Sequence, residues 1–205
     1  MRHQSIIIID NFLDNPDEIR SLGGKMNYPN LKEQSNFPGR NSLQRLNIQN
    51  IDNYIEDLTN ESLTSMTEYS HGKFRLTLAK DEGKAKVHLD NSQWSGILYL
   101  TEDEHCQGGT DFYRHNETGL DSTLLTDQKI KDLGWKNREI ANRKINDIII
   151  NQTNDDACWE HIMRVPMKFN RLLLMRPWLW HTAGPGFGDS YENGRLVYLL
   201  FYKST

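Results

Sequence analysis

The apolar residues near the start of the chain fall in short runs that predict one strand and one helix. The β-branched run Ile6–Ile9 ends at Asp10 and predicts a buried strand over residues 5–9. A helix is predicted next, because Asn15 can cap it and Pro16 fits its first turn. The chain therefore opens with a strand followed closely by a helix.

The next segment combines a loop with a second helix. Residues 27–45 contain prolines and many polar groups, and they predict a loop. Apolar residues then recur at helical spacing over residues 48–58, which predicts an amphipathic helix that packs on the body of the protein. Residues 61–70 fit either a continuation of this helix or a strand.

From Phe74 the apolar period changes to two, as expected for strands that have two different faces. This rhythm is typical of an antiparallel β-sandwich or barrel. Residues 119–157, rich in Asn, Asp and Lys, interrupt it; they predict an inserted lid or edge cover with a helix over 135–150. The predicted strands cover residues 74–78, 87–89, 94–100, 111–114, 159–165, 171–175, 178–182 and 195–202.

Length and composition fit one globular domain over residues 1–205, with an N-terminal strand and helices over 1–70 and a β core over 74–202. Hydrophobic residues make up 37% of the 205 residues, enough for a core when they are grouped in short runs. The net charge of −4 gives no general attraction to nucleic acid or anionic membranes. No apolar stretch approaches the ~20 residues that cross a bilayer.

The two cysteines, Cys106 and Cys158, lie far apart and form no CxxC pattern. A disulfide framework is therefore not expected, and reduced thiols suit a soluble cytoplasmic protein.

The candidate chemistry begins at His88-Leu89-Asp90, at the end of an apolar alternating run. Two residues apart on a strand, His88 and Asp90 would point to the same face and could share a metal ion. His181 follows a strongly apolar strand and is the candidate third ligand. Two histidines and one carboxylate are the ligand set of non-haem Fe(II) oxygenases. Arg195 opens the last strand, and a buried guanidinium there implies a carboxylate partner.

In the order of these motifs the chain resembles the 2-oxoglutarate/Fe(II)-dependent dioxygenases, nearest their prolyl 4-hydroxylase-like branch. The resemblance covers roughly residues 74–202, and its motifs are individually weak but specific as an ordered set. The matching residues are His88-Leu89-Asp90, Gly96-Ile97-Leu98-Tyr99-Leu100, Gly108-Gly109-Thr110-Asp111-Phe112, Asn170-Arg171-Leu172-Leu173-Leu174, His181 and Arg195.

The resemblance implies a mainly β protein with flanking helices: a double-stranded β-helix (jelly roll, cupin-like) core with the N-terminal helices packed on one sheet. It implies that His88, Asp90 and His181 bind Fe(II), and that Arg195 and the Tyr99 hydroxyl bind the distal carboxylate of 2-oxoglutarate. The implied reaction uses O2, releases succinate and CO2, and hydroxylates a substrate. The resemblance does not identify this substrate, which is either a peptide or protein side chain or a small molecule.

Three features depart from the family pattern. Leu199 stands where prolyl hydroxylase-like members often carry a hydroxyl, four residues after the arginine. The segment between His181 and Arg195 is long, and the insertion at 119–157 is not part of the minimal pattern. None of the three involves the proposed metal ligands, but each can alter cosubstrate affinity or substrate choice.

Other residues fit simpler explanations. His115-Asn116-Glu117 is a rival His-x-Glu that lacks the apolar lead-in, and it is expected in an exposed loop. Arg171 fits a solvated charge at the start of a strand as well as it fits the family residue. Trp94, Trp178 and Trp180 are expected to pack, and no catalytic role is expected for the remaining histidines, His3, His71, His105 and His161.

Two further functions remain compatible with the same residues. One is a non-catalytic, cupin-like metal-binding or structural β-barrel. The other is a metal-dependent enzyme that does not use 2-oxoglutarate, in which Arg195 would have no cosubstrate to bind.

Overall fold

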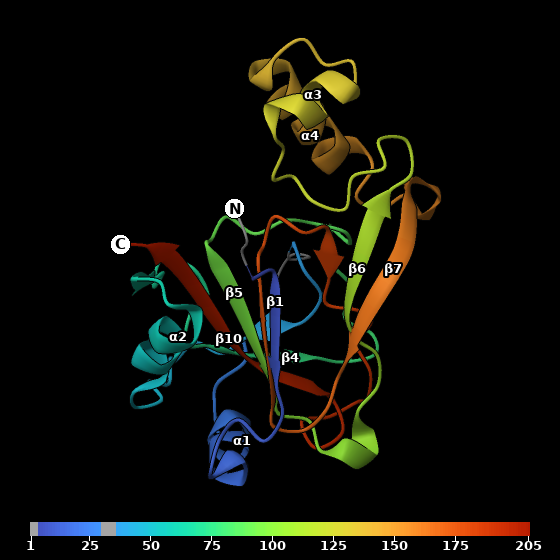
Figure 1. Cartoon of the computed structure of the whole chain (residues 1–205). Coiled ribbons are helices and arrows are strands. Elements are labelled where there is room, and N and C mark those ends of the chain that lie inside the picture. The colour runs from blue at the N-terminus through green and yellow to red at the C-terminus, as the bar shows by residue number, and fades with distance from the viewer. Residues whose placement is uncertain (1–3, 30–35) are drawn as a thin grey trace.

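Two antiparallel β-sheets form the body of the protein in this computed structural model, which describes residues 4–29 and 36–205 (Figure 1). The strands are β1 (Ile6–Ile9), β2 (Arg40–Asn41), β3 (Leu63–Ser65), β4 (Phe74–Thr77), β5 (Trp94–Tyr99), β6 (Gly109–His115), β7 (Trp159–Pro166), β8 (Arg171–Met175), β9 (His181–Thr182) and β10 (Arg195–Ser204). The helices are α1 (Pro16–Gly24), α2 (Ile51–Thr59), α3 (Asp127–Asp132) and α4 (Arg138–Asn151), with short 3-10 helices at Asp103–His105 and Asp156–Cys158.

The larger sheet has the order β1-β8-β5-β10-β4-β2, with β3 added along β10, and the smaller sheet has the order β7-β6-β9. Alternation along β10 separates two cores. Leu196, Tyr198 and Leu200 pack in the core that α1 and α2 cover, whereas Val197 and Leu199 pack towards the smaller sheet. The predicted packing of the N-terminal helices on one sheet is therefore confirmed.

The first predicted strand and helix are both present, with two differences in detail. β1 pairs with β8 on one side and ends the sheet, so Ile8 is 47% exposed and the strand is not buried as predicted. Asn15 precedes α1, but its side chain makes no capping hydrogen bond. The predicted loop over 27–45 contains the short strand β2; its residues 30–35 lie outside the described part of the chain. β3 resolves the ambiguity over 61–70 in favour of a strand.

Two predicted strands are wrong or shorter than expected, and both carry candidate metal ligands. Residues 87–89 form no strand; His88 makes an isolated antiparallel bridge with His181 instead. The strand predicted over 178–182 reduces to β9. The pairing is short here because the Asp90 N–H donates to the carbonyl of Pro177. It therefore does not extend the pairing that begins at the His88–His181 bridge. The two chain segments therefore meet over a short contact.

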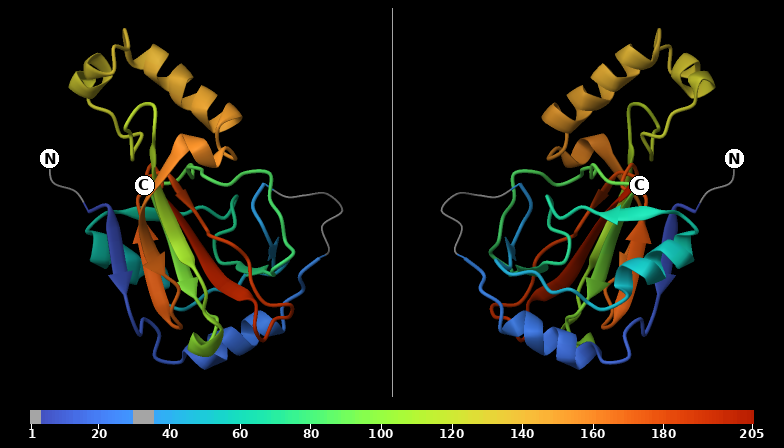
Figure 2. Two further views of the ribbon diagram at one scale, coloured as in Figure 1. Left: turned by 90° about the vertical axis from the view of Figure 1, so that its right-hand side faces the viewer. Right: turned by 90° about the vertical axis from the view of Figure 1, so that its left-hand side faces the viewer.

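The insertion holds two helices where one was predicted, because α3 precedes α4. Both views in Figure 2 place these helices beyond one end of the sheets, opposite the end near α1. Ile145 and Ile148 of α4 pack in a third apolar cluster with Val87, Trp159 and Trp180. The insertion is thus attached beside the residues that precede His88 and His181. Among the described residues, none of the helices combines the length and apolarity that crossing a bilayer demands.

Candidate metal centre

The side chains of His88, Asp90 and His181 converge beside the first residues of β5. Nε2 of His88 lies 3.8 Å from Oδ1 of Asp90, and Nε2 of His181 lies 3.5 Å from Oδ2 of the same carboxylate. The two imidazole rings are 4.4 Å apart between centroids. One ligand atom from each residue lies within 4.8 Å of the other two, so a single ion can bind all three side chains.

Each imidazole is held in the orientation that a metal ligand needs. Nδ1 of His88 lies 2.8 Å from the carbonyl oxygen of Lys86, and Nδ1 of His181 lies 2.7 Å from that of Leu179. A carbonyl oxygen can only accept, so each Nδ1 carries the proton and donates it. In the neutral form of each ring the lone pair is therefore on Nε2, which lies beside the carboxylate and is available to a cation.

The carboxylate is held by a serine on the larger sheet. Oγ of Ser95, at the second position of β5, donates to Oδ2 of Asp90 over 2.6 Å, and Oγ of Ser92 lies 2.9 Å from the Ser95 hydroxyl. Burial alone would raise the pKa of Asp90. The neighbouring imidazoles of His181 and His88 and the Ser95 hydrogen bond nevertheless hold that pKa well below its usual range. The carboxylate is therefore ionised, as a metal ligand must be.

Burial also keeps His88 neutral. Removal from water, together with the neighbouring His181, lowers the pKa of His88 to about 4. The ring of Phe37 covers His88, with 4.2 Å between ring centroids. Neutral imidazole is the form that binds metal ions, so at physiological pH His88 need not lose a proton before it binds one.

Backbone contacts fix the two ligand segments to each other. His88 N–H donates to the His181 carbonyl over 2.9 Å, and His181 N–H returns a bond of 3.2 Å to the His88 carbonyl. The Asp90 N–H donates to the carbonyl of Pro177, the residue after Arg176. The ligand positions thus depend on the segment that follows β8.

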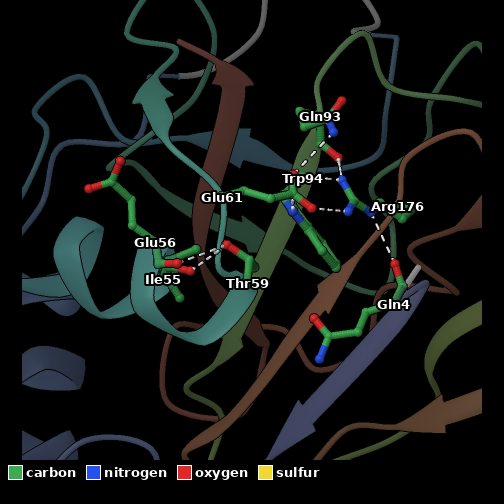
Figure 3. A network of polar contacts seen from close by, with 8 residues as sticks. All are labelled: Gln4, Ile55, Glu56, Thr59, Glu61, Gln93, Trp94 and Arg176. Carbon is green, nitrogen blue, oxygen red and sulfur yellow. Dashed lines mark hydrogen bonds and ion pairs between the residues drawn. The ribbon is translucent and has the colours of Figure 1, made fainter. Parts of the chain in front are cut away.

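Arg176 is the anchor of that segment (Figure 3). Its guanidinium lies 3.8 Å above the Trp94 ring, forms an ion pair with Glu61, and donates to the carbonyls of Gln93 and Gln4. The Arg176 side chain is buried. These contacts connect the segment after β8 to the residue that precedes β5 and to the loop after α2.

The three candidate ligands open into a cavity of about 650 Å³. One wall is apolar and comes from the inner face of the larger sheet, where Ile97, Leu199 and Met175 lie. No residue of the 119–157 insertion lines this cavity, so in the described part of the chain the insertion does not cover it as a lid.

Arg195 lies deeper between the sheets, on the same face of β10 as Leu199 but outside the cavity lining. It is 2% exposed, and neither its Nε nor its Nη2 has a hydrogen-bond partner in the described part of the chain. The ring of Tyr99 is 5.9 Å away, and the Tyr99 hydroxyl lies 2.7 Å from Oγ1 of Thr110. Burial lowers the pKa of Arg195. A buried cation without an anion is costly unless a ligand supplies the anion.

Two other sequence predictions can be compared with the structure. His115 does not lie in an exposed loop: it is 1% exposed on β6, with its ring nitrogens near Thr118 and Gln152 and its ring against Trp159. That prediction is wrong because the strand continues past Arg114. Arg171 forms a bidentate ion pair with Asp10 and so has a structural role at the start of β8.

The tryptophans and cysteines behave largely as expected. Trp94 and Trp180 are fully buried packing residues, and both cysteines are free thiols. A second group, Glu102, Glu104 and His105, also falls within 4.8 Å, but it lies on a short 3-10 helix at the surface and holds no buried ligand.

Sequence reasoning missed three side chains at this centre. Ser95 could have been suspected from its position just after the His-x-Asp motif at the start of an apolar strand. Arg75 alternates with apolar residues on β4, which marks its face but not its role. Nothing in the sequence indicates that Phe37, from the predicted loop, covers His88.

A family model matches residues 1–202, and it describes a family of unknown function, DUF6445. The chain belongs to this family. No curated protein resembles this DUF6445 chain closely enough in sequence to match it.

Solved structures show what fold this DUF6445 member has. HygX from Streptomyces hygroscopicus, solved with nickel, 2-oxoglutarate and hygromycin B, superposes with a TM-score of 0.58 at 11% identity, covering 98% of this chain and 83% of that one. AviO1 from Streptomyces viridochromogenes gives 0.53 at 12% identity, covering 99% and 91%. SnoK, a non-haem alpha-ketoglutarate-dependent carbocyclase from nogalamycin biosynthesis, gives 0.52 at 12% identity, covering 99% and 81%.

At such identities the likeness establishes the fold. It is a mainly β fold of antiparallel sheets that 2-oxoglutarate-dependent oxygenases use. The narrower resemblance to the prolyl 4-hydroxylase-like branch stays a prediction.

Proposed function

We propose that this protein is a non-haem Fe(II)- and 2-oxoglutarate-dependent oxygenase that hydroxylates its substrate. The observation that carries the proposal is the convergence of two imidazole Nε2 atoms and one carboxylate, each held by its own hydrogen bond. This ligand set is the facial arrangement of non-haem iron oxygenases, which leaves coordination positions open. Residues His88, Asp90 and His181 would hold the ion.

The strand order supports the same assignment. The larger sheet alternates strands distant in sequence, and the smaller sheet places His181 beside His88 across a short bridge. We infer from this strand order a double-stranded β-helix, with the proposed metal ligands at its open end. The double-stranded β-helix core that the sequence predicts is therefore part of this proposal.

Arg195 supports 2-oxoglutarate as the cosubstrate. Its buried guanidinium has unpaired N–H groups, and the deep position between the sheets lies on the cavity side of β10. A dicarboxylate that binds near the metal could reach it, and an arginine fork suits a carboxylate. Tyr99, whose hydroxyl now contacts Thr110, would turn that hydroxyl or share it with the bound carboxylate.

Bound Fe(II) and 2-oxoglutarate would supply the oxidation: O2 is reduced, 2-oxoglutarate gives succinate and CO2, and one oxygen atom becomes the hydroxyl of the product. The residues of the chain prepare this chemistry. The fixed imidazoles and carboxylate bind and orient the ion, and Arg195 neutralises the far end of the cosubstrate. The apolar wall formed by Ile97, Leu199 and Met175 keeps water from the reacting centre.

The direct test is anaerobic addition of Fe(II) and 2-oxoglutarate, followed by absorption spectroscopy and then by succinate measurement in air. We expect a visible charge-transfer band and slow, uncoupled succinate formation in the wild type, and neither in His88→Ala. His161→Gln is the matched control, because His161 lies outside the metal centre and Gln can keep its contact with Asp111. Absence of both signals in freshly loaded wild-type protein would exclude the oxygenase.

Arg195→Met separates the proposed enzyme from a structural β-barrel and from a metal enzyme without 2-oxoglutarate. Loss of a buried partner for a carboxylate costs about 2–5 kcal/mol, so we expect the dissociation constant of 2-oxoglutarate to rise by at least about 30-fold. Metal affinity should change little, since Arg195 does not contact the ligands. Arg171→Met is the control, because Arg171 is already paired with Asp10. Unchanged 2-oxoglutarate binding in Arg195→Met would contradict the assignment of the cosubstrate.

A further inference from the structure

Beside its apolar wall, the cavity at the candidate metal centre is lined by basic side chains. Arg45, Lys73 and Arg75 all line the cavity. None of them forms an ion pair with a carboxylate within 4 Å in the described part of the chain, although several exposed lysines and arginines elsewhere do. The net charge of the whole protein is −4, so these three cations form a local excess of positive charge. The guanidinium of Arg45 donates to the carbonyls of His71, Thr67 and Tyr69, which are neutral acceptors.

Arg75 is the most constrained of the three. Its guanidinium donates to the carbonyls of Phe37 and Pro38 and to Oδ1 of Asn41, over 2.6, 2.8 and 3.0 Å. A guanidinium has five N–H donors, so two remain for a ligand. Burial and the nearby Arg195 lower the pKa of Arg75 to about 10, which still leaves it charged. The neutral acceptors hold the guanidinium in place without neutralising it.

Lys73 lies two residues before Arg75, and its carbonyl accepts from the Leu199 N–H. Lys73 and Arg75 therefore project to the same side of the sheet. Lys73 has no side-chain ion pair or hydrogen bond in the described part of the chain. The two cations stand together beside the apolar wall that Leu199 helps to form.

The charges of the loaded site leave these cations uncompensated. Fe(II), Asp90, a doubly charged 2-oxoglutarate and Arg195 sum to zero. Besides Asp90, the described lining of the cavity holds one carboxylate, Glu68, which faces Lys203 at 3.8 Å. Asp81 lies outside the cavity lining and interacts electrostatically with Arg75. Its carboxylate already accepts from the Leu78 N–H. Even with Asp81 counted, the basic wall keeps an excess of positive charge that a bound anion would neutralise.

Neighbouring hydroxyls add donors for the same anion. Oγ of Ser70 accepts from Asn41 Nδ2 over 2.7 Å, so its own proton is available to a ligand. Tyr69 and Phe201 contribute rings to the cavity, 6.4 Å apart between centroids. The cavity thus places donors and positive charge next to aromatic and aliphatic surface.

We propose that the substrate of this oxygenase is a small organic acid, whose anionic group is bound by Lys73 and Arg75 while its apolar part lies against Ile97, Leu199 and Phe201. The cavity volume of about 650 Å³ suits a small molecule. This assignment of the substrate class rests on the proposed oxygenase function. A carboxylate is the expected anion, and a phosphate ester has the same charge chemistry.

The test measures binding to the protein loaded with Mn(II) and 2-oxoglutarate, by calorimetry. The probes are 3-phenylpropionate, its primary amide, and phenethyl phosphate. We expect the acid to bind at least about tenfold more tightly than the amide, because the amide has the same shape without the charge. Lys73→Met should abolish this preference and Lys73→Arg should retain it. Lys80→Met, an exposed lysine outside the cavity, should behave like the wild type.

The outcomes are distinguishable. Failure of the wild type to bind Mn(II) and 2-oxoglutarate contradicts the proposed function itself. If Mn(II) and 2-oxoglutarate bind normally, three results contradict the substrate class alone. The anionic probes are not preferred over the amide, they do not bind at all, or the preference remains intact in Lys73→Met. Tighter binding of phenethyl phosphate than of 3-phenylpropionate supports the basic wall and assigns the anion to phosphate esters.

Discussion

At the scale of single residues, the candidate metal centre depends on three hydrogen bonds that do not involve the metal. The carbonyls of Lys86 and Leu179 fix the two imidazoles, and the Ser95 hydroxyl fixes the carboxylate. The first two are backbone groups and no side-chain substitution removes them. Ser95 is therefore the point at which the support of the ligands can be tested by mutation.

We predict that Ser95→Ala weakens metal binding about 10- to 100-fold, because Asp90 loses the donor that orients it. Isothermal titration with Mn(II) measures the affinity. Ser92→Ala is the matched control: its hydroxyl contacts Ser95 but not Asp90, so its affinity should remain that of the wild type. Wild-type affinity in Ser95→Ala would show that the serine does not hold the carboxylate.

The residues of the centre were predictable to different degrees for physical reasons. His88, Asp90 and His181 could be selected because few residue types bind metals and their order along the chain is informative. Arg75 could not, since an arginine between apolar neighbours on a strand is common on solvated faces. Its position on the cavity wall depends on the loop at 37–41, which supplies its hydrogen-bond acceptors and carries no periodic pattern.

At the scale of elements, alternation was a sound guide in the centre of the larger sheet. β5, β8 and β10 are central in the larger sheet and were predicted nearly to their ends. Prediction failed at 87–89 and 178–182, where the pairing reduces to one bridge and the two-residue strand β9. The apolar residues there are buried by α4 and Trp159, and not by sheet pairing.

Arg176 links these elements, and we predict that Arg176→Met lowers the free energy of unfolding by about 3 kcal/mol, as expected when one partner of a buried ion pair is removed. The remaining Glu61 then lacks its cation, and the carbonyls of Gln93 and Gln4 lose a donor. Urea denaturation measures the change. Glu61→Gln is the milder control because an amide can still accept from the guanidinium. Equal stability of Arg176→Met and the wild type would contradict the anchoring role.

The same pair gives a pH dependence with a definite sign. Burial alone would raise the pKa of Glu61, but hydrogen bonds from Arg176, Gln93 and Trp94 hold it below its ordinary value of 4.5. A carboxyl whose pKa is lower in the folded state stabilises the fold above its unfolded pKa and loses that contribution as the pH falls through the folded pKa. Stability measured below pH 4.5 should therefore fall less steeply in Glu61→Gln than in the wild type.

At the scale of the whole molecule, the inserted segment is attached next to the candidate metal centre but outside its cavity. The end of the insertion is bonded to the segment that leads to His88. Oγ1 of Thr153 donates to the Val87 carbonyl over 2.5 Å, and the Val87 N–H returns a bond to the Thr153 carbonyl. Asn154 accepts from the Lys86 N–H and donates to the Lys84 carbonyl. Segments about 70 residues apart are thus held as one unit.

We predict that these bonds support His88 as a candidate metal ligand, and the double variant Thr153→Val/Asn154→Ala tests this role. Each lost hydrogen bond is worth on the order of 1 kcal/mol. Part of this free energy is lost from metal binding, because residues 84–88 must then become ordered when the metal binds. We predict several-fold weaker Mn(II) binding in the double variant with the apolar contacts of α4 intact. Asn151→Ala is the control, since Asn151 bonds to Asp147 within the same helix. Equal Mn(II) affinity of the double variant and this control would show that the insertion stabilises the fold without supporting His88.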